Sequence, residues 1–323
     1  MRKSPLLRGL VAASIAATLT CLAPGAKAQV ESFKIMAPAN AGGGFDTVAR
    51  VLADALRASG QVKSVTVENK AGAGGAIGLA QFINTEKGNP HALIVAGAVT
   101  AASIEANKSP VNLSMVTPIA RLMGEYNVIV VPPSSPIKNM KDLAAALKAN
   151  PGAVAIGGGS AGSVDHVMVA LIGETVGVHS DKVNYVAFAG GGEGKAAILG
   201  GQLTAYVSGY GELVDLIKAG KLRAIGLSAD TRQKDIDVAT LKEQGVDVVM
   251  YNWRGVFAPA GITDAQKKQL VGMVEAAMKD PSWKTRAEKL EWLELYQPAD
   301  TFKAFVESES RRLKDVIGKL KLN

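Results

Sequence analysis

The sequence predicts an α/β fold of two domains, and three observations predict it. Apolar segments typical of strands alternate with segments of helical periodicity almost throughout, which favours layers with largely parallel sheets. The length of 323 residues is too great for one small core and suits two domains. Finally, clusters of glycine recur where an apolar strand ends and a helix begins.

The first half of the chain shows this alternation most clearly. Its expected elements, in chain order, are strand 33–38, helix 47–59, strand 65–67, helix 77–83 and strand 93–96. In the first helix, one buried stripe is predicted from apolar residues at helical spacing: Val48, Val51, Leu52, Ala55 and Leu56. Two strands, 117–122 and 126–131, then follow in immediate succession. This break in the alternation predicts the first crossing between domains.

A second α/β series occupies the chain from Val131 to about Met250. Its expected strands are 154–156, 185–188, 204–207 and 223–227. A long apolar strand, 248–257, is expected to return to the first domain. The remainder is expected to be helical, in segments 264–279, 282–293 and 300–320. Thr263 is expected to cap the first of these helices, and Asp280-Pro281 to end it.

Residues 1–28 are predicted to be a signal peptide rather than part of the fold. A basic start precedes the apolar stretch 10–23, which is too short to span a bilayer. Ala26-Lys27-Ala28 then fits a small-residue cleavage site, which predicts cleavage before Gln29. A lipid anchor on Cys21 is the alternative, but residues 18–20 lack the small side chains that such an anchor requires. We therefore expect an exported, periplasmic protein.

Composition excludes several classes of function. Without the four basic residues of the signal peptide, 32 of the 36 basic residues remain against 29 acidic ones, a net charge of +3. That charge is too weak for a nucleic-acid partner, and aromatic residues, at 5%, are too scarce for a base-stacking surface. The only cysteine lies in the signal peptide, so the mature chain has no disulfide. No later segment is long and apolar enough to cross a membrane.

The glycine clusters predict a binding site for an anion. They lie at 42–44, 72–75, 157–162 and 190–192, each beside an expected helix start. A helix start offers unpaired N–H groups and the positive end of the helix dipole. Glycine lets a negatively charged group approach that backbone closely. The sequence therefore predicts a site for a small molecule with more than one negative group. Tight turns are the alternative explanation for the glycines, which the number of separate clusters makes less favoured.

Two enzyme motifs overlap one of these clusters. Gly157, Gly159 and Gly162 match the dinucleotide-binding spacing, but the next strand ends without the acidic residue that holds the ribose. The same turn places Ser160 in a nucleophile-elbow pattern. Only His166 and His179 follow it, within the next twenty residues, so the usual acid-then-histidine order is missing. An exported serine hydrolase using Ser160 remains an alternative.

The remaining chemistry-bearing residues have structural alternatives. Three histidines without a nearby cysteine or carboxylate cluster predict no metal site, and no cofactor is expected. Asp46, at a helix start, is explained by N-terminal capping or by a contact with a ligand. His166 is either a packed helix residue or a hydrogen-bond donor to a ligand.

The order of the motifs resembles the substrate-binding receptors of tripartite tricarboxylate transporters, the Bug receptors. Segments 38–46 and 67–78 are similar to the first two loops of that family. Further similar segments are 158–162 with His166, 183–193, 199–202 and 252–259. The resemblance runs from about Ser32 to the C-terminus. Ala71 departs from it, since proline is common there, and so does the variable stretch before His166.

The resemblance implies a two-lobed periplasmic binding protein of type II, a Venus-flytrap fold whose hinge consists of two crossover strands. The first lobe would comprise residues 29–125 and 252–323, and the second residues 126–251. Such a receptor captures a small di- or tricarboxylate, here most similar to citrate-type receptors, and delivers it to integral-membrane permease subunits. It would act as a monomer and catalyse no reaction. A ligand-sensing receptor without transport is a further alternative.

The expected ligand-binding residues come from both lobes. Glycines would donate through the backbone, hydroxyls would complete the carboxylate shell, and two phenylalanines would exclude water. From the first lobe they are Asn40, Gly43, Gly44, Phe45, Asp46, Gly74, Gly75 and Thr100. From the second they are Ser160, Ser163, His166, Phe188, Gly190, Gly191, Ser208 and Tyr210. The resemblance implies that backbone groups and waters, rather than paired arginines, hold the ligand.

Overall fold

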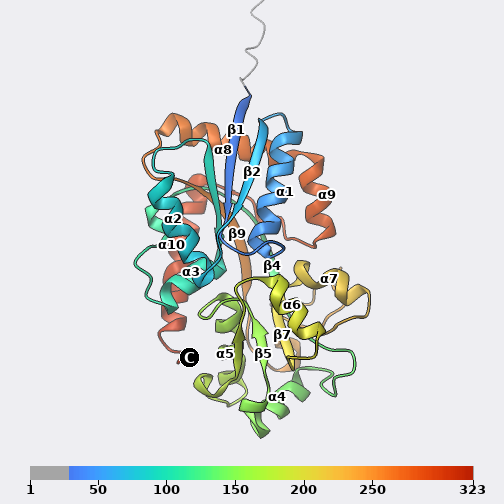
Figure 1. The fold of residues 1–323 in the computed structure, drawn as a ribbon. Helices are drawn as coiled ribbons and strands as arrows, with labels where there is room; N and C mark the ends of the chain where they lie inside the picture. The colour runs from blue at the N-terminus through green and yellow to red at the C-terminus, as the bar shows by residue number, and fades with distance from the viewer. Residues whose placement is uncertain (1–28, 323) are drawn as a thin grey trace, which may run out of the picture.

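The computed structural model describes residues 29–322 and has the expected α/β fold in two lobes (Figure 1). The predicted signal peptide and Cys21 lie outside the described residues. The helices are α1 (Gly44–Ala58), α2 (Ala76–Thr85), α3 (Ala98–Ala106), α4 (Met140–Ala149), α5 (Val164–Thr175), α6 (Gly191–Leu199), α7 (Tyr210–Lys218), α8 (Asp264–Lys279), α9 (Pro281–Lys289) and α10 (Ala299–Ile317). Short 3-10 turns occupy Ala73–Gly75, Leu113–Met115, Pro151–Ala153, Ser180–Lys182 and Lys242–Gln244. Within the described part, no helix is long and apolar enough to cross a membrane.

The upper lobe of Figure 1 is a sheet covered by helices on both faces. Its strands run in the order β2 (Val62–Asn69), β1 (Val30–Ala37), β3 (Ala92–Gly97), β9 (Tyr251–Ala258) and β4 (Thr117–Val131). Alternate side chains of β1 serve opposite faces: Ile35 joins the core under α1, α8 and α9, and Met36 the core under α2, α3 and α10. Successive side chains of a strand point to opposite faces, so in a sheet that is buried on both faces they enter two different cores.

The lower lobe contains the second series. Its strands are β7 (Ala205–Gly209), β5 (Ile156–Gly158) and β6 (Tyr185–Ala187), with β8 (Arg223–Leu227) on the other side of β4. The short strand β10 (Gln297–Pro298) pairs with β4 in the upper lobe. The parallel β5–β6 and β5–β7 pairs confirm the expected strand–helix alternation.

The prediction of two successive strands at 117–122 and 126–131 is wrong, because β4 is one continuous strand of 15 residues. Gly124, which lies between the two expected strands, stays in the ladder opposite Trp253. A side chain there would collide with Leu295, whose Cδ1 lies 2.6 Å from the ideal Cβ position, so packing explains the glycine. Residues up to Tyr126 pair with β9, and residues from Asn127 onward pair with β7.

Two other expected boundaries shift by a few residues. The strand expected from Val248 begins later, at Tyr251, and the helix expected to reach 293 ends earlier, at Lys289. The expected cap is confirmed: Thr263 accepts from the Gln266 N–H at 3.3 Å, and Gln266 accepts from the Thr263 N–H at 2.8 Å. These strands and helices bring the glycine turns of both lobes to one place.

Candidate functional site

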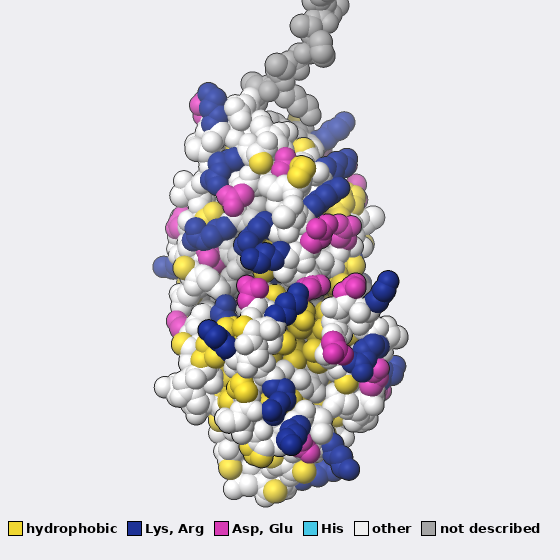
Figure 2. Space-filling view, turned by 90° about the vertical axis from the view of Figure 1, so that its right-hand side faces the viewer, with side chains coloured by type: hydrophobic (Ala, Val, Ile, Leu, Met, Phe, Trp, Pro, Cys, Tyr) yellow, Lys and Arg dark blue, Asp and Glu magenta, His cyan; other side chains and the backbone are white. Residues whose placement is uncertain are grey.

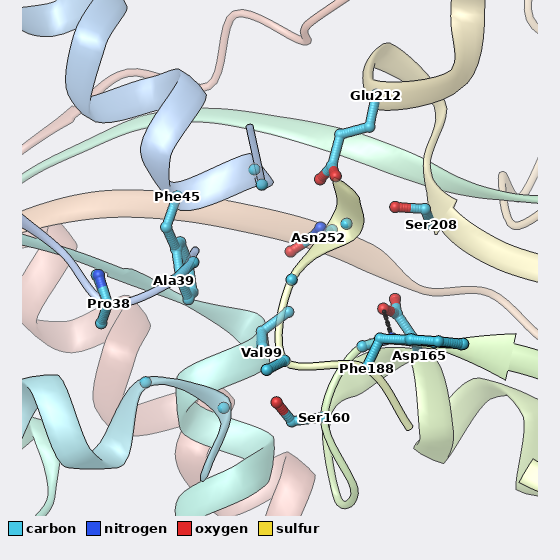
Figure 3. Close-up of a pocket in the computed structure, with 18 of the residues that line it drawn as sticks. Pro38, Ala39, Phe45, Val99, Ser160, Asp165, Phe188, Ser208, Glu212 and Asn252 are labelled. Atoms are coloured by element: carbon cyan, nitrogen blue, oxygen red, sulfur yellow. Dashed lines mark hydrogen bonds between the residues drawn. The ribbon is translucent and has the colours of Figure 1, made fainter. Parts of the chain in front are cut away.

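A cavity lies where the two lobes meet, lined by residues of both (Figure 3). Loops from the upper lobe supply Pro38, Ala39, Gly43, Gly44, Phe45, Gly74, Gly75 and Val99. The lower lobe and β9 supply Gly159, Ser160, Asp165, Phe188, Ala189, Gly190, Gly191, Tyr206, Ser208, Glu212, Asn252 and Arg254.

Five helices begin at this cavity without a side-chain cap. The N-cap residues of α1, α2, α3, α6 and α7 are glycines that make no side-chain capping bond: Gly43, Gly75, Gly97, Gly190 and Gly209. Each of these helices contributes a cap or first-turn residue to the cavity lining. By contrast, α4, α8 and α9 begin away from it and are capped by Asn139, Thr263 and Asp280. Helix α5, whose Asp165 also lines the cavity, keeps a side-chain cap at Ser163, and at the start of α7 the Gly211 N–H donates to Glu125 Oε2 at 3.3 Å. The glycine N-caps therefore leave backbone N–H groups at the cavity without a partner from the cap residue itself.

The turn before α2 requires glycine for two reasons. Gly74 and Gly75 have φ of 61° and 100°, a region that side chains other than glycine rarely adopt. A Cβ at Gly74 would also collide with the side chain of Ser103. At Gly75 it would lie 2.9 Å from Thr100 Oγ1. The backbone of this turn is therefore exposed to the cavity while its far side packs on α3.

A buried ion cluster forms the back of the cavity. Arg254 Nη1 lies 2.7 Å from Glu125 Oε1, and its Nη2 donates to Glu212 Oε1 at 2.7 Å. Arg254 and Glu125 are almost fully buried, at 2% and 0% exposure. Burial raises the pKa of Glu125 to about 7, although Arg254 opposes this. The Glu212 carboxylate also lies against the starts of α1 and α6, since a Cβ on Gly44 or Gly191 would collide with it.

Asp165 adds a second buried acid to the same wall. Its Oδ1 accepts from Asn127 Nδ2 at 2.5 Å, and its Oδ2 accepts from the Gly159 N–H at 2.9 Å. Burial, together with the charge of Glu212, raises the pKa of Asp165 to about 7, although the hydrogen bond from Gly159 opposes this. Figure 3 shows Asp165 and Ser208 on the side of the cavity opposite Phe45.

Most of the residues expected to bind a ligand line this cavity. The ten that do are Gly43, Gly44, Phe45, Gly74, Gly75, Ser160, Phe188, Gly190, Gly191 and Ser208. Phe45 and Phe188 lie on opposite sides of it, consistent with their expected role as apolar walls (Figure 3). Whether these residues contact a ligand remains a prediction.

The other six expected residues do not line the cavity: Asn40, Asp46, Thr100, Ser163, His166 and Tyr210. Asn40 donates to Glu193 across the two lobes at 2.7 Å. Asp46 holds the loop before α1 by accepting from the Gly42 N–H at 2.8 Å and from Arg50 Nε at 2.9 Å. Thr100 lies behind Gly75, and Tyr210 is buried in the core of the lower lobe. These contacts give the four residues structural roles in this conformation.

His166 and Ser163 shape the turn before α5 rather than the cavity. Ser163 is the N-cap and accepts from the His166 N–H at 3.5 Å. His166 Nδ1 accepts from the Gly162 N–H at 3.0 Å, and its ring stacks on Tyr185 at 4.2 Å. Burial lowers the pKa of His166 to about 4, so its ring is neutral at pH 7. The sequence could not separate this packed role from a ligand contact.

Sequence reasoning missed the charged residues of the site. Arg254, Glu212, Asp165 and Asn252 were not among the expected binding residues. The resemblance implied that paired arginines do not hold the ligand, and Arg254, within the apolar segment 248–257, was not considered. A charged residue inside a buried strand requires ionic partners. Arg254 was therefore itself the sequence signal that carboxylates pack beside this strand. The partners lie 129 and 42 positions away along the chain, which no local pattern reveals. Among the described residues, no group of three potential ligands could hold a metal ion.

A family model described as the tripartite tricarboxylate transporter family receptor matches residues 48–322. The chain belongs to this family. Its members are substrate-binding receptors rather than enzymes, which removes the serine-hydrolase alternative for Ser160. The receptor is similar to protein BugT of Bordetella pertussis, with 31% identity over 71% of this chain and 70% of BugT.

Solved structures share the fold of the receptor. One described as a periplasmic transporter has a TM-score of 0.83 at 25% identity, covering 90% of this chain and 97% of its own. MatC from Rhodopseudomonas palustris with bound malate has a TM-score of 0.81 at 24% identity, covering 89% of this chain and 99% of its own. The two-lobed periplasmic binding-protein fold is therefore confirmed.

The buried neutral ring of His166 predicts a pH dependence of stability. As pH falls from about 6.5 to about 4, the unfolded chain takes up a proton on His166 and the folded receptor does not. The free energy of unfolding should therefore decrease over this range. In His166→Gln this decrease should be smaller by about 2–3 kcal/mol.

The measurement is urea unfolding of both proteins across that pH range. Asp165 and Glu125 titrate in both proteins, so their contributions largely cancel in the comparison. His179→Gln is the control, because the His179 side chain is 61% exposed. Parallel pH profiles for the wild type and His166→Gln would show that the folded protein tolerates a charged ring there.

Proposed function

We propose that this receptor is periplasmic, captures a small di- or tricarboxylate between its lobes and delivers it to the permease subunits of a tripartite transporter. One observation carries the proposal: five helices without side-chain caps begin at one cavity between the lobes. Converging helix starts favour negative charge, and glycine allows close approach to their backbone. The starts of α1 and α6 already lie against Glu212, and the start of α7 donates to Glu125, so α2 and α3 offer the remaining N–H groups. Citrate-like ligands, expected from the sequence, belong to this class.

The family supports the same chemistry. The matched model describes receptors of tricarboxylate transporters, and MatC, with the same fold, was solved with malate. In this receptor, Ser160 and Ser208 add hydroxyl groups to the lining, and Phe45 and Phe188 add apolar surface. A second candidate function, ligand sensing without transport, uses the same site and differs only in the partner.

We further propose that residues 29–125 with 252–323 form one lobe and residues 126–251 the other. Two segments then form the hinge, near Gly124–Asn127 in β4 and near Met250–Trp253 before and within β9. The pairing of β4 changes partner at this point, from β9 to β7. Contacts across the cleft hold the lobes together, including Asn40 with Glu193 at 2.7 Å and Asn107 with the Ala161 carbonyl at 3.2 Å. The structure thus has the contacts of a closed form.

The first prediction concerns ligand charge. Citrate, malate, succinate and adipate should be screened by thermal unfolding, and at least one should raise the Tm, since a ligand that binds only the folded state stabilises it. Glucose should leave the Tm unchanged because it is uncharged, and arginine because its net charge is positive. A shift with glucose and none with any carboxylate would contradict the proposal.

The second prediction concerns access to the backbone. Gly43 has φ of −81°, which any residue adopts, and its Cβ position lies 3.5 Å from the Gly191 N. Gly43→Val should therefore fold but fill the cavity, weakening carboxylate binding by about tenfold or more. Gly272→Val is the matched control, because nothing lies within 4 Å of a Cβ there. Calorimetry showing equal affinity for folded Gly43→Val and the wild type would refute backbone recognition at this turn.

The third prediction concerns the hinge. A ligand held by both lobes favours the closed form, so a bound carboxylate should reduce the radius of gyration without changing helix content. Small-angle X-ray scattering and circular dichroism measure the two quantities. Identical scattering with and without a saturating ligand would contradict closure on binding. The exception is a receptor that is already closed without ligand, and in that case a cross-lobe disulfide that locks the receptor closed should also leave the scattering unchanged.

A further inference from the structure

A second groove lies behind the junction of the lobes, on the opposite face of β9 from the cavity. Along this strand, Asn252 and Arg254 line the cavity, whereas Tyr251 and Trp253 line the groove. The separation follows from the strand itself, because successive side chains point to opposite faces. The groove has a volume of about 520 Å³, which is enough for a small molecule. The proposed function does not use it.

Trp253 brings an unpaired hydrogen-bond donor to this groove. Its side chain is 1% exposed and packs edge-on against Phe302 and Phe305, with ring centroids 5.9 and 5.2 Å away. Its indole N–H is buried and has no acceptor among the described residues. The indole nitrogen can only donate. Because a buried donor without a partner is costly, this N–H calls for an acceptor from a molecule in the groove.

Arg121 adds a guanidinium without an ionic partner. Its Cζ lies 4.3 Å from the centroid of the Phe305 ring, and its Nε donates to the Leu295 carbonyl at 2.8 Å. Within residues 29–322, its two terminal nitrogens donate no hydrogen bond, and no carboxylate lies within 4 Å of them. Burial lowers the pKa of Arg121, although the charge of Glu309 opposes this. The free edge of a guanidinium is the usual partner of a carboxylate.

The charge of the groove is unbalanced. Figure 2 shows basic and acidic side chains interspersed on one face of the molecule, so opposite charges lie near one another there. The groove instead has two guanidiniums, Arg121 and Arg312, and one carboxylate, Glu309. Glu309 already accepts from Arg312 Nε at 3.0 Å and from its Nη2 at 2.5 Å. The other lining residues are uncharged, so one negative charge is missing beside Arg121.

We propose that this groove is a second ligand site, for a small monocarboxylate with an apolar body. Its carboxylate accepts from the Arg121 guanidinium and from the Trp253 indole N–H, since both groups lie against Phe305. Its apolar body packs against Met250, Tyr251 and Phe305. The single uncompensated guanidinium sets one negative group, and the apolar walls set the rest of the molecule.

The groove also spans the proposed hinge, which gives its occupant an effect on closure. Val249 and Met250 belong to the lobe of residues 126–251, whereas Arg121 and Trp253 belong to the other. Because the groove lies behind the hinge, closing the cleft in front widens it. An occupant therefore favours the closed form and raises the affinity of the cleft for its own ligand. This effector role rests on the proposed function, whereas the site itself does not.

Three probes of nearly the same shape test the site. Benzoate is an anion, benzamide is neutral and benzamidine is a cation. Each of the three tryptophans gives one indole N–H signal in a nuclear magnetic resonance spectrum, and Trp253→Phe identifies that of Trp253. If this variant does not fold, Trp283→Phe and Trp292→Phe identify the signal by exclusion.

Benzoate should shift the Trp253 signal saturably at up to millimolar concentration. It should bind about tenfold or more tightly than benzamide, since hydrogen bonds to a charged group are the stronger ones. Benzamidine should leave the signal unchanged. No saturable shift with benzoate, or equal affinity for benzoate and benzamide, overturns the proposal.

A variant assigns the binding to Arg121. Arg121→Met keeps an apolar stem over Phe305 but removes the guanidinium, so the affinity for benzoate should fall about tenfold or more. Arg311→Met on the exposed face of α10 is the control, because Arg311 does not line the groove, and it should keep the full affinity. Unchanged affinity in folded Arg121→Met would show that benzoate acts from elsewhere and overturns the site. If Arg121→Met does not fold, the comparison of benzoate with benzamide still decides.

The effector role has its own measurement. A carboxylate that binds the cleft is titrated by calorimetry with and without saturating benzoate, and its affinity should rise about fivefold or more when benzoate is present. The gain should disappear in Arg121→Met. Unchanged or lowered affinity refutes the effector role alone. If no carboxylate binds the cleft, the proposed function fails, whereas the Trp253 signal still tests the groove.

Discussion

The buried ion pairs of Arg254 are the interaction on which the rest of the site depends. They join three elements at the junction of the lobes: β9 through Arg254, β4 through Glu125 and α7 through Glu212. Removing one partner of such a cluster leaves a buried charge uncompensated, typically at a cost of about 3–5 kcal/mol. The cluster also fixes the Asn252 amide through Glu125. The same residues thus hold the lobes together and form one wall of the cavity.

The distribution of helix caps complements that wall. Where helices begin away from the cavity at α4, α8 and α9, Asn139, Thr263 and Asp280 satisfy the first N–H groups. Five helices that begin at the cavity have a glycine N-cap instead, whereas α5 keeps its cap at Ser163. A glycine N-cap gives up a bond of about 1 kcal/mol. Under the proposed function, a bound anion would restore part of that loss and so couple ligand binding to stability.

Local sequence patterns predicted most helices and strands and the cavity-lining glycines of the upper lobe, because a strand–glycine–helix turn is encoded by consecutive residues. Gly43, Gly44, Gly74 and Gly75 were found in this way, and the family resemblance added Ser160 and Phe188. Local patterns failed where long-range packing decides. Two strands were expected on either side of Gly124, but the strand is continuous and the packing of Leu295, far along the chain, explains the glycine. Arg254 and its partners were missed for the same reason. His166 lies in a turn next to the cavity, but its ring packs on Tyr185 instead of lining the cavity.

The position of β9 has a consequence for the order of folding. This strand lies between β3 and β4, although more than a hundred residues separate it from either in sequence. The upper sheet cannot close until residues 251–258 are available, so its central pairs are contacts of very high sequence separation. Such contacts form late and slowly. A nascent chain that lacks its last quarter therefore has no complete upper sheet, because β3 and β4 lack the strand that lies between them.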